Sequence, residues 1–129
     1  MKLTNNEIYN YANALGQEFG ANASLKLPIK VNFFLQKNIK TLVEAATDIE
    51  NSRIEIAREY GVLTEDGESY QIPPEKIDDA SKELNDLFGL EQDLPIKKFN
   101  LEDFNNIELT TAQMSALLFM IKDEPIEDE

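Results

Sequence analysis

Residues 28–60 read PIKVNFFLQKNIKTLVEAATDIENSRIEIAREY, and after Pro28 this segment contains neither proline nor glycine. Proline fits the first turn of a helix, and glycine commonly follows the last turn. Pro28 and Gly61 therefore mark the two ends of one predicted helix. A helix of these 33 residues would be about 50 Å long, which is long enough to organise the whole chain around it.

Apolar residues recur along this helix in steps of four and three. The positions concerned are Leu35, Ile39, Leu42, Ala46, Ile49, Arg53, Ile56 and Tyr60. Such spacing is typical of a heptad seam, and Arg53 is the one residue that interrupts it. Further apolar residues lie outside the seam. We therefore expect the helix to be covered by the rest of the chain, by a second copy in a homo-oligomer, or by another partner.

Shorter elements are predicted on both sides of the long helix. The patterns favour helices over residues 5–19, 75–88 and 112–121, and a hairpin over 62–72 with an Asp-Gly turn. Residues 94–99 are expected to be extended. The predicted fold class is mainly α (α+β), a long central helix packed with shorter helices and a small β-hairpin or three-stranded sheet. Residues 1–122 are expected to form a single compact domain, and 123–129 an acidic, disordered tail.

The composition removes several kinds of chemistry. The 129 residues include no cysteine and no histidine, so a disulfide, a thiolate nucleophile, a cysteine–zinc site and a histidine base are excluded. No Walker loop, dinucleotide-binding motif or Gly-x-Ser-x-Gly motif is present. No apolar run approaches the length of a membrane span. We expect a protein that is not an enzyme, needs no cofactor or metal, and has no membrane segment.

The net charge of −13 is unevenly distributed along the chain. Residues 1–60 hold seven acids and seven bases, whereas residues 61–129 hold eighteen acids and five bases. An excess of negative charge repels nucleic-acid backbones and anionic lipids. We therefore expect no direct nucleic-acid binding. The acidic half instead predicts a basic protein partner, or a role in solubility alone.

A basic stripe is the clearest candidate site. Lys26, Lys30, Lys37 and Lys40 lie in a segment without acids, and Lys30, Phe33, Lys37 and Lys40 fall on one side of the predicted helix. Such a stripe suits a phosphate, a nucleotide or an acidic partner, with Phe33 available for stacking. The alternative is that these lysines line the solvated edge of the helix and pair with the protein's own acids.

Arg53 is the second candidate, because it occupies a seam position. An arginine there either marks the point where the helix emerges from the core or pairs with a carboxylate. Glu50, one turn earlier, is the expected surface partner.

Several short motifs resemble one family of proteins. They are LPIKV at 27–31, QKN at 36–38, RIEIAREYG at 53–61, EDG at 65–67 and IELT at 107–110. The chain resembles an uncharacterised family of small helical proteins encoded by phages and prophages of low-GC Gram-positive bacteria. The resemblance implies a phage origin and a role in the host cytoplasm, and it supplies no catalytic residues.

Together these features predict a phage-encoded, non-enzymatic binding protein that inhibits or sequesters a component of host defence. In one version the acidic half inhibits a basic host protein. In the other, the basic stripe holds a small anionic nucleotide as a sponge. The alternative is a structural or morphogenesis protein that self-associates through the long helix.

Overall fold

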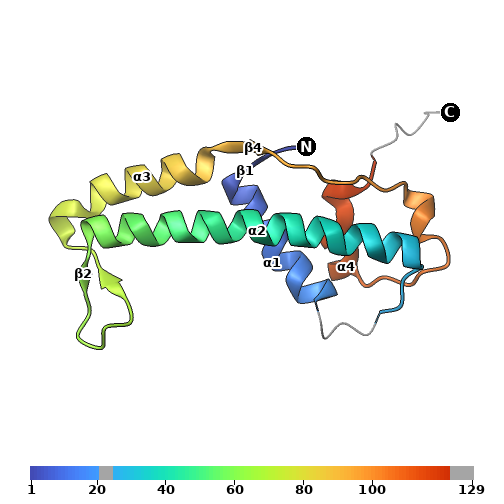
Figure 1. The fold of residues 1–129 in the computed structure, drawn as a ribbon, viewed down its shortest axis with the longest axis horizontal. Coiled ribbons are helices and arrows are strands. Elements are labelled where there is room, and N and C mark those ends of the chain that lie inside the picture. Colours follow the sequence, from blue (N-terminus) through green and yellow to red (C-terminus); the bar gives the residue numbers. More distant parts are fainter. Residues whose placement is uncertain (21–24, 123–129) are drawn as a thin grey trace.

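The computed structural model describes residues 1–20 and 25–122. In chain order the elements are β1 (Lys2–Thr4), α1 (Asn5–Phe19), α2 (Ile29–Tyr60), β2 (Val62–Leu63), β3 (Tyr70–Gln71), the 3₁₀ turn η1 (Pro74–Lys76), α3 (Ile77–Gly89), β4 (Glu91–Asp93), η2 (Leu101–Phe104), α4 (Thr111–Leu117) and η3 (Leu118–Met120). The predicted fold class is confirmed: the long helix α2 runs the length of the molecule and shorter helices pack against it (Figure 1).

The ends of α2 follow the local sequence. Pro28 is the N-cap and Ile29 the first helical residue. At the other end the backbone N–H of Gly61 donates to the carbonyl oxygen of Ala57 at 2.8 Å. A Cβ on Gly61 would lie 2.5 Å from that oxygen and 2.9 Å from the Cβ of Tyr70, distances that no side chain tolerates. Glycine is therefore required where the chain leaves α2.

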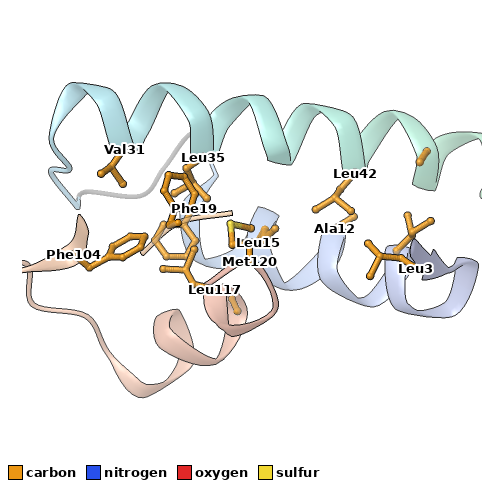
Figure 2. Close-up of a cluster of buried hydrophobic side chains, with 14 of the residues drawn as sticks. Leu3, Ala12, Leu15, Phe19, Val31, Leu35, Leu42, Phe104, Leu117 and Met120 are labelled. Atoms are coloured by element: carbon orange, nitrogen blue, oxygen red, sulfur yellow. The ribbon is translucent and has the colours of Figure 1, made fainter. Parts of the chain in front are cut away.

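The hydrophobic core occupies one half of the molecule, which we call the head (residues 1–20, 25–49 and 90–122). Here α1 packs on α2 and α4 packs on α1, and side chains from all three helices meet in the core (Figures 1 and 2). The buried residues are Leu3, Ile8, Ala12, Leu15, Phe19, Val31, Leu35, Leu42, Ala45, Ile49, Phe99, Phe104, Ala116, Leu117 and Met120. Helix α1 begins with a capping box between Thr4 and Glu7.

The remaining half, residues 50–89, forms an arm. Helix α3 lies along the C-terminal half of α2, and the β2–β3 hairpin projects from the end of that helix (Figure 1). Within these residues, all of which the structure describes, only Ala80 is buried. Two helices alone cannot enclose a core, so the arm keeps its apolar side chains partly exposed.

The buried stripe of α2 differs from the predicted seam. The buried residues are Val31, Leu35, Asn38, Leu42, Ala45 and Ile49, whereas the expected Ile39 and Ala46 are only half-buried. The stripe lies one residue away from Ile39 and Ala46 because α1 covers the helix and Asn38 bonds to the segment after β4. The seam is therefore covered by its own chain in the head and left open in the arm.

Two short antiparallel pairs make up the β structure in the described part of the chain. The hairpin pairs β2 with β3 as predicted. The second pair, β1 with β4, was not predicted, because three-residue strands that contain Lys2, Thr4, Glu91 and Asp93 carry no apolar alternation. Residues 94–99, expected to be extended, form no strand: of them only Phe99 pairs, in an isolated bridge with Ile121. The three-stranded alternative is thereby excluded for the described residues.

Among the described residues, no helix is both long enough and apolar enough to span a bilayer. The predicted tail, residues 123–129, lies outside the described residues.

Candidate anion-binding site

A small cavity of about 140 Å³ opens at the end of the head where α2 begins. Its lining residues are Lys30, Val31, Phe34, Lys97, Lys98, Phe99, Asn100, Asp103 and Lys122. Four of these nine are lysines, which come from α2, from the segment between β4 and η2, and from the residue after the Phe99–Ile121 bridge. We call this site the lysine pocket.

Asn38 fixes the position of Lys97. Its side chain is 2% exposed, and it makes two hydrogen bonds to the backbone of that lysine. The Nδ2 group donates to the carbonyl oxygen of Lys97 at 2.9 Å, and the backbone N–H of Lys97 donates to Oδ1 at 2.9 Å. One amide thus satisfies both polar groups of a backbone unit, which joins α2 to the segment that carries Lys97 and Lys98.

The bridge between Phe99 and Ile121 brings Lys122 to the same place. The N–H of Phe99 donates to the carbonyl oxygen of Met120 at 2.7 Å, and the N–H of Lys122 donates to the carbonyl oxygen of Phe99 at 2.7 Å. Phe99 itself is buried against Phe104, with ring centroids 5.5 Å apart. The bridge is therefore anchored in the core, although Lys98 and Lys122 are exposed.

Aromatic rings form one wall of the pocket and its rim. The ammonium group of Lys97 lies 5.4 Å from the ring centroid of Phe34, and that of Lys37 lies 5.9 Å from the centroid of Phe33. The two rings meet edge to face at 5.2 Å. Cation–π contact at this distance orients a lysine without neutralising it. These lysines therefore keep their charge available to a ligand.

The local field at the pocket is positive. The first turn of α2 contains no acid, and no side chain in the described residues caps it, so the positive end of the helix dipole adds to the lysines. Of the residues that the structure describes, Asp103 is the one acid in the lining, and its Oδ2 accepts the backbone N–H of Asn100 at 2.9 Å. Between the described residues, no ion pair involves any lysine of the pocket.

No protein-family model, curated protein or solved structure matches this chain. What the pocket can hold follows from its own chemistry. Four lysines in one lining, an uncapped helix start and apolar walls suit a phosphate or carboxylate group. In residues 1–20 and 25–122, no group of three or more carboxylates lies close enough to share a metal ion.

The structure brings together only part of the predicted basic stripe. Lys30 lines the pocket, and Phe33 and Lys37 lie together beside it, with Phe33 60% exposed. Lys26 is exposed just before α2. Lys40 instead approaches Glu44, the next turn along, with 4.0 Å between Nζ and Oε1.

Sequence reasoning missed the other three lysines of the pocket. Lys97 and Lys98 are the only adjacent basic residues in the chain, and this pair was the signal available. Nothing in the sequence places Lys122 beside them, because that contact depends on the bridge to Phe99.

Arg53 lies in the arm and takes no part in the pocket. It forms the predicted surface pair with Glu50: Nη2 lies 2.5 Å from Oε1 and Nε lies 3.0 Å from Oε2. Hydrogen bonding from Arg53 lowers the pKa of the Glu50 carboxyl below its ordinary value. Tyr9 of α1 donates to the same carboxylate at 3.4 Å, so the pair also connects α1 with α2.

A second hollow lies between α1 and α2, with a volume of about 250 Å³. It is lined by Ala12, Asn13, Val43, Ala46, Thr47, Glu50 and Asn51. Its single charged lining group, Glu50, is already paired with Arg53. This groove therefore offers apolar surface but no charge for a ligand, and the lysine pocket is the stronger candidate.

Proposed function

We propose that this protein is a non-enzymatic binding protein whose lysine pocket sequesters a small phosphorylated ligand. The observation that carries the proposal is the convergence of Lys30, Lys97, Lys98 and Lys122 on one cavity. Like charges repel one another, and this chain has 25 acids with which to separate them. Among the described residues, only Asp103 lies with them in the lining. A site that gathers positive charge in an acidic protein is best explained by an anion that binds there.

The size of the pocket indicates which part of the ligand it holds. Pockets that enclose whole drug-sized molecules have volumes of about 300–1,000 Å³, whereas this one has about 140 Å³. The cavity suits one or two phosphoryl groups, while the rest of the ligand remains outside. Phe33 stands exposed beside the pocket and can stack on a base. A nucleotide fits this division better than a bare phosphate.

The resemblance to phage and prophage proteins gives the proposal its biological setting. We assign the ligand to host defence, where a nucleotide signal would be bound and withdrawn from its receptor. Sequestration of this kind needs affinity and abundance but no catalytic group, which agrees with a chain that lacks histidine and cysteine.

Calorimetry with pyrophosphate, ATP and cyclic di- and trinucleotides tests the proposal. We expect at least one of them to bind the wild type, and Lys98→Glu to weaken that binding at least tenfold. The matched control is Lys82→Glu, which makes the same charge change on an exposed lysine of the arm. The affinity of Lys82→Glu for the ligand should stay within about twofold of the wild-type value. Equal titrations for wild type and Lys98→Glu, or an equal loss in the control, would contradict the proposal.

A second candidate function rests on the arm. Residues 50–89 hold eleven acids and four bases, a net charge of −7, which suits inhibition of a basic host protein. Screening by salt weakens such contacts, so binding of that protein should fall steeply between low and physiological ionic strength. Capture of a host protein by the wild type that persists unchanged at high salt would argue against this function.

A further inference from the structure

Exposed apolar side chains gather at both ends of α2. At the start of the helix, beside the lysine pocket, Ile29 is 88% exposed and Phe33 is 60% exposed. Just beyond the other end, Val62 is 63% exposed and Leu63 is 52% exposed. Single exposed apolar residues need no explanation, but a group of them can mark a contact surface. Ile29 and Phe33 share one face of α2, while Val62 and Leu63 lie on opposite faces of the hairpin. The helix thus carries one candidate contact surface at each end.

The two surfaces have opposite charge. Lys26, Lys30 and Lys37 accompany the first, which we call the basic end. The hairpin that contains Val62 and Leu63 also carries Glu65, Asp66 and Glu68, all exposed; we call this the acidic tip. Each surface therefore matches the other in apolar character and complements it in charge. Neither matches a copy of itself, because identical ends would repel.

The acidic tip is held in a defined shape. The N–H of Thr64 donates to the carbonyl oxygen of Ser69 at 2.9 Å, and the N–H of Gly67 donates back to Thr64 at 2.9 Å. The Asp66 carboxylate accepts the N–H of Glu68 at 3.1 Å and also bonds to the Thr64 hydroxyl. A preorganised surface loses less conformational entropy when it docks. The hairpin is therefore suited to present its charges to a partner.

We propose that copies of this chain associate head to tail, the acidic tip of one copy docking on the basic end of the next. The surfaces lie at opposite ends of a helix of 32 residues, about 48 Å apart, so one molecule cannot join its own two ends. A contact between two different surfaces repeats indefinitely unless it closes into a ring. The partner is a second copy because the complementary surface is present on the same chain.

This arrangement differs from association through the heptad seam. In the head α1 covers α2, with Leu35, Leu42 and Ile49 of the seam buried, so a second helix cannot pack along the whole seam. A symmetric pairing of two arms would bring two net charges of −7 together. Head-to-tail contact avoids both problems. Head-to-tail association does not depend on the proposed ligand, although a phosphate bound in the pocket would compete with the acidic tip.

Sedimentation velocity of the full chain tests the proposal. We expect the average mass at low salt to rise with concentration beyond a dimer, and to return to the 14.7 kDa of one chain at high salt. Phe33→Asp removes the basic end's apolar contact, and Leu63→Asp removes that of the acidic tip. Each variant alone should stay monomeric. An equimolar mixture should form a one-to-one dimer that grows no further, because one intact surface of each kind remains.

Leu90→Asp is the matched control, since Leu90 is 58% exposed between α3 and β4 and belongs to neither surface. It should assemble as the wild type does. A wild type that stays monomeric or stops at a dimer would overturn the proposal, and so would a mixture of the two variants that remains monomeric. Leu63→Asp keeps the lysine pocket intact, so its titration with phosphorylated ligands tests the proposed function separately.

Discussion

At the scale of single residues, the site depends most on Asn38, a polar side chain inside a hydrophobic core. Its amide satisfies the N–H and the carbonyl oxygen of Lys97, and its Nδ2 also lies 3.5 Å from the Sδ of Met120. Periodicity alone could not identify this role, because an asparagine beside an apolar seam normally faces water. The sequence alone therefore could not identify Asn38 as the residue that positions the pocket.

Replacing Asn38 with leucine should both destabilise the protein and weaken anion binding. The substitution roughly preserves volume but removes both part-buried hydrogen bonds to the backbone of Lys97, at a cost of about 1–3 kcal/mol. Chemical denaturation measures the stability, and calorimetry with the pyrophosphate or nucleotide bound by the wild type measures the affinity. Asn32→Ala, at an exposed position of the same helix, is the control and should change neither. An unchanged denaturation midpoint for Asn38→Leu would refute this role.

Arg53 should control the titration of Glu50. Hydrogen bonding from Arg53 lowers the folded-state pKa of this carboxyl below its ordinary 4.5. The stabilisation it gives is thus present above the unfolded pKa and lost as the pH falls through the lowered folded value. Arg53→Gln should raise the pKa of Glu50 and reduce the loss of stability in that acidic range. NMR titration of the Glu50 carboxyl measures this, with Arg58→Gln as a control that leaves it unchanged.

At the scale of elements, the long helix was the most predictable feature and the short strands the least. Pro28 and Gly61 determine the ends of α2 through restrictions on the local backbone. Such restrictions apply in any tertiary context. The buried stripe, by contrast, depends on which segments cover the helix, and these place Asn38 and Ala45 inside instead of Ile39 and Ala46. Strands β1 and β4 are too short and too polar for alternation to reveal them.

Two glycine substitutions should have opposite effects. Gly61→Ala places a methyl group against Ala57 and Tyr70, so it should destabilise the junction of α2 with the hairpin by about 1–3 kcal/mol. Gly16→Ala meets no atom within 4 Å inside helix α1, and it should stabilise by about 0.5–1 kcal/mol. Thermal denaturation of both variants compares them directly. A stabilising effect of Gly61→Ala would show that the junction is not tightly packed.

At the scale of the whole molecule, the charges are distributed differently in the fold than along the sequence. The sequence divides into a neutral half before Gly61 and an acidic half after it. In the structure Lys97, Lys98 and Lys122 return from the acidic half to the start of α2. Lys30 was therefore predictable as a site residue, since it lies within one helical stripe. Its three companions were not, because only tertiary contacts bring them there.

The acidic residues after Lys122 should tune the lysine pocket. Residues 123–129 begin directly beyond a lysine of the pocket and hold five acids. A chain of that length reaches at most about 25 Å, and one charge about 10 Å away contributes about 0.4 kcal/mol in water before screening. Replacing all five with their amides should therefore strengthen binding of a phosphorylated ligand at low salt by up to about 2 kcal/mol, which is about thirtyfold. The gain should shrink toward zero near 1 M salt, where the screening length is about 3 Å.

A matched variant separates this effect from total charge. It carries amides at five exposed acids of the arm, Glu65, Glu68, Glu75, Asp78 and Asp79, and so has the same net charge as the tail variant. These positions lie at the opposite end of α2 from the pocket (Figure 1), many screening lengths away at physiological salt. Calorimetry at low and high salt should show the gain for the tail variant and little change for the arm variant. Equal gains would mean that the pocket responds to net charge alone and that the place of these acids after Lys122 in the sequence has no influence.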